Sequence, residues 1–249
     1  MAKIHVLVRK EELDRERLDG KVVVVLDVLF ATSSIVTALA HGAREVLPML
    51  DGAAALAEAK LRPPGSCVLA GELDAATLPG FADPMPLALL RQELAGKTLV
   101  YSTTNGTVAL AKAKEAARVY AAALLNGEAV AEAISRAARD ETVLLVCAGS
   151  AGRFNLEDFY GAGYLVSLLA ARGGHELSDS ALAARMLHDG RDAFACLAES
   201  RVGRLMRSRG LEDEVRFAAQ RSRFAVVPRL EGGRVCDGSR GRAGELDGG

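Results

Sequence analysis

Residues 22–27 read VVVVLD, a run of five aliphatic residues that ends at a carboxylate. A run without polar alternation is typical of a strand buried on both faces of a parallel sheet. Two later runs end in the same way, Thr98–Tyr101 before a polar loop at 102–107 and Thr142–Val146 before one at 147–153. In α/β sheets, ligands bind beyond the carboxyl ends of such strands, where helix N-termini offer free N–H groups to anions. We therefore expect one composite anion site built from three loops.

The composition is typical of a globular protein and favours small molecules over nucleic acid as partners. The 249 residues are 50% hydrophobic and 25% charged, and the formal net charge is -1. This balance lacks the broad basic field of a general nucleic-acid binder. No apolar stretch is long enough for a membrane span, and the first residues do not resemble a secretory signal. We expect a cytoplasmic protein with neither nucleic acid nor membrane as partner, and a homo-oligomer is left open.

Strands and helices alternate along the chain, which predicts an α/β fold: layered α/β/α with largely parallel buried strands. Residues 1–238 are expected to form this α/β domain, either as one unit or as two closely packed α/β lobes. The Gly-rich, charged residues 239–249 are expected to form a disordered tail. Further strands are expected at 1–8, 45–49, 66–70, 119–124 and 224–228, and helices at 31–41, 51–61, 107–117, 157–172, 178–187, 191–209 and 212–220.

Four carboxylates stand at strand ends or in the first turn of a helix, namely Asp27, Glu72, Glu157 and Asp158. Mg²⁺ prefers oxygen ligands, usually one or two carboxylates completed by substrate phosphate and water. The alternative for Glu157 and Asp158 is a pair of acids that interact favourably with the helix dipole. That alternative does not explain Asp27, because a carboxylate after five aliphatic residues is costly unless a charged group meets it.

The loop at 102–107 reads STTNGT and precedes a predicted helix. Its hydroxyls, its amide and its flexible glycine could together wrap a phosphate with side-chain and backbone donors. The alternative is an ordinary helix-capping turn, although six residues are more than a cap needs. The candidate substrate-binding residues are Ser102, Thr103, Thr104, Asn105, Gly106 and Thr107, with Ser150 from the next loop.

Cys147 and Arg153 have the spacing of cysteine-dependent phosphatases, in which a thiolate attacks phosphorus and the arginine holds the oxygens. Val146 and Phe154 stand where such enzymes usually carry His and Ser or Thr. We therefore favour a structural role for the cysteine and keep Arg153 as an oxyanion clamp. The cysteine mechanism remains an alternative.

Taken together, these motifs resemble the 2-phosphosulfolactate phosphatase family of coenzyme M biosynthesis. The likeness runs from about Asp27 to Pro228, and the STTNGT string at 102–107 is its most specific part. It also includes DVL at 27–29 with ATS at 31–33, GE at 71–72, and CAG at 147–149 with RF at 153–154 and LED at 156–158. The resemblance implies Mg²⁺-dependent hydrolysis of a small phosphomonoester that bears a sulfonate and a carboxylate, on that family's α/β architecture.

The resemblance also suggests roles for the candidate residues. Asp27, Glu72 and Asp158 would hold Mg²⁺, and Glu157 would position the attacking water. Ser102, Thr104, Asn105 and Arg153 would stabilise the charge on the transferring oxygens.

Three departures from the family pattern concern the substrate. The family has Arg where Phe30 stands and Arg where Leu73 stands, and a Gly-Asn-Ser-Pro string is replaced within residues 80–86. Each missing Arg removes a bidentate contact with an oxyanion. The sequence therefore predicts a phosphatase for 2-phosphosulfolactate or a related, less anionic phosphoester. The second alternative is a non-catalytic anion-binding or regulatory protein with the same fold.

Overall fold

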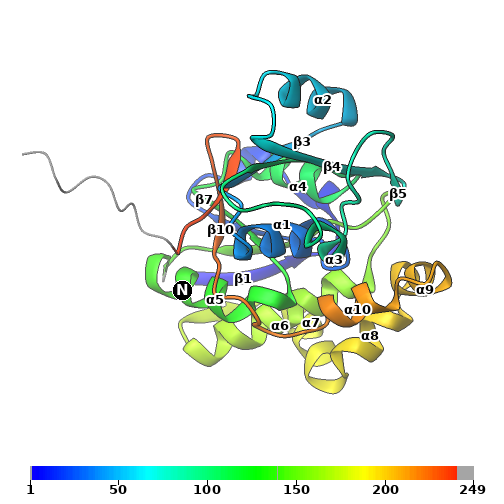
Figure 1. Cartoon of the computed structure of the whole chain (residues 1–249). Coiled ribbons are helices and arrows are strands. Elements are labelled where there is room, and N and C mark those ends of the chain that lie inside the picture. Colours follow the sequence, from blue (N-terminus) through cyan, green and yellow to red (C-terminus); the bar gives the residue numbers. More distant parts are fainter. Residues whose placement is uncertain (1, 139, 240–249) are drawn as a thin grey trace, which may run out of the picture.

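The computed structural model of the chain describes residues 2–138 and 140–239. A mostly parallel central sheet lies between two layers of helices (Figure 1), which confirms the predicted α/β class with a layered α/β/α arrangement. Residues 240–249 of the predicted tail lie outside the described residues.

The strands are β1 Ala2–Leu7, β2 Val22–Leu26, β3 Glu45–Met49, β4 Cys67–Leu73, β5 Ala76–Thr77, β6 Thr98–Ser102, β7 Arg118–Ala122, β8 Val143–Cys147, β9 His175–Leu177, β10 Pro228–Glu231 and β11 Arg234–Asp237. The α-helices are α1 Ala31–Ala40, α2 Gly52–Lys60, α3 Pro86–Leu89, α4 Gly106–Ala113, α5 Gly127–Ala137, α6 Leu156–Arg172, α7 Asp179–Gly190, α8 Ala193–Glu199, α9 Arg201–Ser208 and α10 Glu212–Ala218. Short 3₁₀ helices lie at Lys10–Glu12, Arg15–Arg17 and Leu124–Asn126.

The sheet joins two parallel sets of strands. Within the described residues, the order is β5-β4-β6-β3-β11-β10-β7-β2-β8-β1-β9. Strands β4, β6 and β3 are parallel to one another, and so are β7, β2, β8, β1 and β9. The hairpin β10–β11 pairs antiparallel with β7 on one side and with β3 on the other. It thereby makes one continuous sheet from the two sets.

Strand β2 shows why the aliphatic runs form the centre of the sheet. All five of its residues are fully buried. Val22, Val24 and Leu26 pack in one hydrophobic cluster with residues of α5, α6 and α7, whereas Val23 and Val25 pack in a second cluster with residues of α1 and α4. Because successive side chains of a strand point to opposite faces, an unbroken aliphatic run covers both.

Two predicted elements near the C-terminus were wrong. The helix expected at 191–209 is two helices, because Ser200 ends α8 with an extended backbone and caps α9 through its side chain, which accepts from the Gly203 N–H. The strand expected at 224–228 begins only at Pro228 and forms the hairpin. Helix α5 and strand β9 were not predicted.

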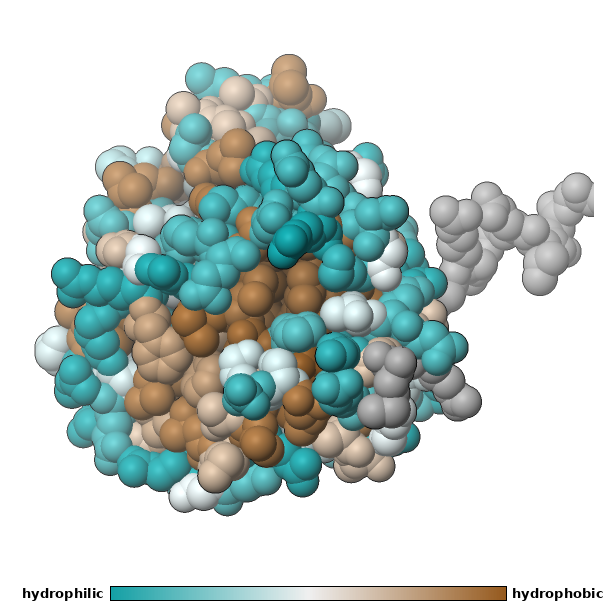
Figure 2. All heavy atoms as spheres, turned by 180° about the vertical axis from the view of Figure 1, so that it is seen from behind, coloured by the Kyte–Doolittle hydropathy of each residue, from teal (hydrophilic) through white to brown (hydrophobic). Residues whose placement is uncertain are grey.

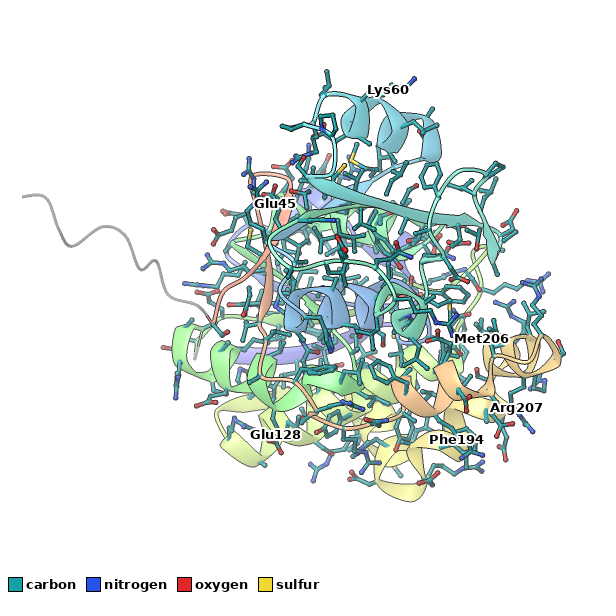
Figure 3. All side chains as sticks on the ribbon, in the orientation of Figure 1. Glu45, Lys60, Glu128, Phe194, Met206 and Arg207 are labelled. Carbon is teal, nitrogen blue, oxygen red and sulfur yellow. The ribbon has the colours of Figure 1, made fainter. Side chains whose placement is uncertain are left out.

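Glu45 fastens the hairpin to β3 at the end of the sheet opposite to the carboxyl ends of the parallel strands. It lies where β3 meets the hairpin (Figure 3) and is 6% exposed. Its carboxylate accepts from the Thr98 hydroxyl at 2.9 Å and pairs with Arg234 of β11 at 3.3 Å and with Arg62 at 3.5 Å. Burial opposes ionisation, but Thr98 and these guanidinium groups hold the Glu45 pKa below its usual value.

The surface opposite to the view of Figure 1 is mixed. Hydrophobic residues gather in its middle and are surrounded by hydrophilic ones (Figure 2). None of the helices in residues 2–138 and 140–239 combines the length and the apolarity needed to cross a membrane. The homo-oligomer stays a prediction of the sequence.

Candidate active site

A cavity of about 270 Å³ opens at the carboxyl ends of the parallel strands. Helix α9 lies beside it, at the same end of the molecule as β5 (Figure 1). The loops after β2, β6 and β8 all contribute to its wall, as expected from the three aliphatic runs. It is lined by Asp27, Phe30, Glu72, Asp74, Ala75, Thr104, Asn105, Ser150, Ala151, Asn155, Glu157, Arg201, Val202 and Leu205.

The cavity is strongly acidic. Four carboxylates line it, those of Asp27, Glu72, Asp74 and Glu157, against the single guanidinium of Arg201 among its described lining residues. Burial, reinforced by the charges of Glu72 and Glu157, raises the Asp27 pKa from 3.8 to about 7. Like charges at close range in a poorly solvated site favour the neutral acid. A cation in the cavity would relieve this repulsion.

Glu157 brings to the cavity a carboxylate with one oxygen that is unpartnered within the described part of the chain. It lies in the first turn of α6 and is 2% exposed. Its Oε2 is buried without a hydrogen-bond partner among the described residues. Burial raises the Glu157 pKa, while its own backbone N–H, Ser200 and Arg201 act in the opposite direction. A buried acceptor without a partner is costly unless a ligand meets it.

Asp158 is adjacent in sequence but does not line the cavity. It is fully buried, and its Oδ1 accepts from the Val28 N–H at 2.9 Å while its Oδ2 accepts from the Gly149 N–H at 3.1 Å. Both oxygens are therefore used to tie the loop after β2 to the loop after β8. Burial, with the charges of Glu157 and Asp27, raises the Asp158 pKa well above its ordinary value.

Glu72 positions the loop after β6. Its Oε1 accepts from the Thr104 N–H at 2.7 Å, and its Oε2 accepts from the Thr104 hydroxyl at 3.2 Å and from the Ala75 N–H at 2.7 Å. Thr103 and Thr107 bond to each other across the start of α4, with the Thr107 hydroxyl donating to the Thr103 carbonyl at 2.8 Å. These two residues therefore serve the capping turn.

Of the predicted STTNGT string, Thr104 and Asn105 line the cavity, whereas Ser102, Thr103, Gly106 and Thr107 do not. At Gly106, however, there is no space for a side chain. A Cβ at this position would lie 2.3 Å from the Ala31 Cβ and 2.7 Å from the Asp27 Oδ2. The glycine thus allows α4 to begin directly against Asp27.

Lys10 is a cation that the sequence reasoning missed. It is 7% exposed, and its ammonium donates to the Asn105 Oδ1 at 2.9 Å and to the Ala148 carbonyl at 3.1 Å. It also pairs with Glu11 at 3.3 Å. Because an ammonium can only donate, it fixes the Asn105 amide oxygen on its own side, which leaves the Asn105 NH₂ as the group that can donate into the cavity. No sequence motif marks Lys10, which follows β1 in an ordinary charged turn.

Arg201 occupies the position expected for Arg153. Arg153 is exposed, does not line the cavity and forms a backbone turn with Ser150. Arg201 instead lines the cavity from the start of α9, and its guanidinium donates to the Asn155 Oδ1 at 3.1 Å and to the Ser150 hydroxyl. Ser150, predicted as a binding residue, does line the cavity. The break at Ser200, which the sequence reasoning did not find, places Arg201 there.

Backbone strain is concentrated at the cavity. Four described residues other than glycine have positive φ, and three of them, Asp74 at 51°, Ala75 at 61° and Ala151 at 50°, line it. Such conformations cost on the order of 1–3 kcal/mol each and are typical of binding and catalytic sites.

The two positions where the family pattern has Arg differ in their relation to the cavity. Phe30 lines the cavity, whereas Leu73 is 59% exposed and does not.

Cys147 is poorly suited to act as a nucleophile. It is fully buried and does not line the cavity. Burial, followed by the charges of Asp158 and Glu157, raises the pKa of its thiol well above the ordinary value of 9.0. A reactive cysteine needs a lowered pKa and access to substrate. The geometry therefore weighs against the cysteine mechanism.

The predicted Mg²⁺ ligands are not brought together as a set of three. Asp27 and Glu72 share the cavity, but Asp158 lies behind it. In the part of the chain that the structure describes, no three His, Cys, Asp or Glu side chains are arranged to hold one metal ion. Mg²⁺ needs fewer, since one or two carboxylates suffice when substrate phosphate and water complete the octahedron. The acidic oxygens of the cavity therefore fit Mg²⁺ in kind, without Asp158.

The fold and the cavity together define an α/β protein with an acidic small-molecule site at the carboxyl edge of a parallel sheet, where ligands bind in this class of fold. The model of the 2-phosphosulpholactate phosphatase family matches residues 7–233. The chain therefore belongs to the 2-phosphosulfolactate phosphatase family, a family of phosphoric monoester hydrolases.

Individual relatives agree with the family model. The chain is 33% identical over 236 residues to a probable 2-phosphosulfolactate phosphatase of Clostridium beijerinckii, covering 94% of this chain and 98% of the relative. It is 38% identical over 225 residues to one of Symbiobacterium thermophilum, covering 88% and 95%. A third, of Carboxydothermus hydrogenoformans, is 38% identical over 242 residues, covering 96% and 98%.

Asp27→Asn should stabilise the metal-free protein above pH 7. Because the folded-state pKa of Asp27 is raised, the folded state binds more protons between pH 3.8 and about 7, so the free energy of unfolding falls as pH rises through this window. Asn carries no charge, so the variant should gain on the order of 2–4 kcal/mol over wild type at pH 8 and nothing at pH 4. Urea unfolding in EDTA measures the free energy of unfolding of each protein.

The control is Asp74→Asn, which removes an exposed acid of the same cavity. Equal stability of Asp27→Asn and wild type at pH 8 would contradict the raised pKa of Asp27.

Asp158→Asn should loosen the two loops that Asp158 joins. An amide replaces one acceptor oxygen by a donor, which leaves the N–H of Val28 or of Gly149 without a partner and costs about 1–3 kcal/mol. Urea unfolding measures the loss, and amide hydrogen exchange should be faster at the affected residue. Asp179→Asn, an exposed acid in the first turn of α7, is the matched control. If both variants lose the same few tenths of a kcal/mol, Asp158 acts only on the helix dipole.

Proposed function

We propose that the protein is a Mg²⁺-dependent phosphatase for a small anionic phosphomonoester, either 2-phosphosulfolactate or a related, less anionic phosphoester. The names of the relatives support the substrate class. The observation that carries the proposal is the excess of carboxylates in a cavity that also offers donors to an anion. A phosphate dianion would be repelled from this cavity unless a cation accompanied it.

Asp27 and Glu72 would hold the metal ion. They are the predicted ligands that line the cavity, and Glu72 is the first charge to act on the Asp27 pKa. Mg²⁺ would supply Lewis-acid polarisation of the phosphoryl group and neutralise part of its charge. Glu72 would also keep its second task of holding Thr104.

Glu157 is the residue best placed to take a proton from water. Its Oε2 has no described partner, and its raised pKa brings it closer to neutral pH, where a general base is most effective. The water oxygen would bond to phosphorus as the bond from phosphorus to the ester oxygen breaks. The alcohol would leave with the proton that Glu157 had received.

Cavity donors would stabilise the transferring oxygens. The Asn105 NH₂, oriented by Lys10, reaches the cavity from the loop after β6, and the Arg201 guanidinium reaches it from the start of α9. Preorganised donors of this kind are usually the largest single contribution to phosphoryl transfer. A place in coenzyme M biosynthesis and a cytoplasmic location stay predictions of the sequence.

A phosphoester panel should show phosphate release that depends on Mg²⁺. We expect activity toward at least one small 2-phosphooxy acid with Mg²⁺ and a loss to background with EDTA. Asp27→Asn should lower kcat at least 100-fold, and Glu157→Gln by about 10²–10⁴. A phosphate-release assay measures each rate. Stabilisation by ligands without phosphate release from any compound would instead identify a non-catalytic binding protein.

Cys147→Ala should retain activity within about threefold of wild type, because the buried thiol does not reach the cavity. Thiol alkylation should likewise leave the rate nearly unchanged at short times. Urea unfolding of the variant controls for lost packing, which costs roughly 1 kcal/mol for a group of this size. Loss of phosphate release in a stably folded Cys147→Ala variant, together with indifference to EDTA, would restore the cysteine mechanism.

A further inference from the structure

A second, smaller cavity opens beside the acidic one. It has a volume of about 50 Å³ and shares Phe30, Glu72, Ala75 and Leu205 with the larger cavity. We call this smaller cavity the annex. A group of the size of water needs up to about 15 Å³ on this measure, so the annex has room for about three heavy atoms. Because the two cavities share these residues, a ligand bound at the carboxylates could extend one substituent into the annex.

The walls of the annex are mostly apolar. Met85 and Met206 are buried, at 4% and 2% exposed, and Met206 lies on α9 next to the exposed Arg207 (Figure 3). The annex is lined by Phe30, Glu72, Ala75, Thr77, Asp83, Pro84, Met85, Leu205, Met206, Arg209 and Leu211.

Several polar groups of the annex are bonded to the protein itself. The Pro84 carbonyl accepts from the Ser34 hydroxyl at 2.6 Å and from the Tyr101 hydroxyl at 3.0 Å. Asp83 accepts from the Met85 N–H at 3.0 Å, and Arg209 donates to the Ala75 carbonyl at 2.8 Å. A ligand group that needs hydrogen bonds would have to compete for these partners.

The charge of the annex offers little to an anion. If Glu72 holds Mg²⁺ as proposed, the other charged groups of the annex are the Asp83 carboxylate and the Arg209 guanidinium, which offset each other. A sulfonate placed there would lose its hydration against Phe30 and the two methionines without a net positive charge to compensate. An apolar group would avoid this cost and would gain by leaving water.

We propose that the annex binds a small apolar side chain of the substrate, so that the preferred substrates are 2-phosphooxy carboxylates whose carbon next to the carboxylate bears a chain of two or three carbons. The inference rests on the proposed function and narrows its substrate. Water attacks phosphorus, the bond from phosphorus to the ester oxygen breaks, and the products are inorganic phosphate and the corresponding 2-hydroxy acid.

A homologous series tests the annex directly. The compounds share the phosphate and the carboxylate and carry a methyl, ethyl, propyl or butyl side chain, with 2-phosphosulfolactate as the sulfonate member. We expect kcat/KM to rise about fourfold for each added carbon up to propyl and then to stop rising, since each buried methylene contributes a nearly constant gain. 2-Phosphosulfolactate should be at least tenfold poorer than the propyl compound.

Leu211→Trp, at a residue that lines the annex but not the larger cavity, should fill the annex and remove the chain-length preference while the methyl compound is still hydrolysed. Leu61→Trp, at an 82% exposed position after α2, is the matched control and should keep the wild-type series. Phe30→Arg should shift the preference toward 2-phosphosulfolactate, because it places a guanidinium at the entrance to the annex.

Two results would overturn the inference: a flat series, or 2-phosphosulfolactate as the best substrate. In the second case, loss of that preference in Arg209→Met would mean that Arg209 holds a sulfonate in the annex. If no compound releases phosphate, the proposed function fails, but the affinities of the same series, measured by calorimetry, still decide the annex. Affinity that rises from the methyl to the propyl compound would support the inference. Equal affinities across the series would refute it.

Discussion

The repulsion among buried carboxylates at the carboxyl end of the sheet is the constraint on which the site depends. Burial opposes ionisation of Asp27, and the charges of Glu72 and Glu157 add to that cost. Such a cluster persists only when the surrounding structure holds it in place. The loops are held by Asp158, which joins the ends of β2 and β8, and by Glu72, which holds the loop after β6. Two of the acids at this end of the sheet, Asp158 and Glu72, therefore hold the loops in place around the other acidic residues.

The sheet supplies the rigidity that these contacts need. Its two parallel sets carry different members of the cluster, since Glu72 comes from β4 and Asp27 from the end of β2. The β10–β11 hairpin bonds to both sets, and Glu45 anchors it at the opposite end through Arg234. At the site, the two sets are also joined by Lys10, which bonds to Asn105 after β6 and to Ala148 after β8. The hairpin, although remote from the cavity, adds main-chain pairing to these side-chain contacts.

The parts of the site that could be predicted are those encoded by local sequence. The aliphatic runs of β2, β6 and β8 marked where strands end, and the rule for parallel sheets brought Asp27, Thr104 and Ser150 to one cavity. Residue type alone could not show that Glu157 lines the cavity while Asp158 lies behind it. The two side chains leave α6 in different directions because they occupy consecutive positions of the helix. Lys10 and Arg201 reach the site only through tertiary structure. The clue to Arg201 was Ser200, a residue favoured at helix N-caps, inside an apparently continuous helix.

The charge balance of the cavity links the fold to the chemistry. Arg201 alone offsets four carboxylates among the described lining residues, and Lys10 lies behind Asn105, where its ammonium is already bonded. A phosphate dianion entering this cavity would add to an existing negative charge in a region where water screens little. Protonation of Asp27 reduces that charge but also removes the oxygen best suited to a metal ion. A divalent cation would resolve the conflict in one step, because it would favour the ionised carboxylate and attract the phosphate. In the proposed enzyme, the raised Asp27 pKa and the excess of acids would be two consequences of one arrangement, in which the electrostatic cost of gathering these acids becomes affinity for a cation together with its anionic substrate.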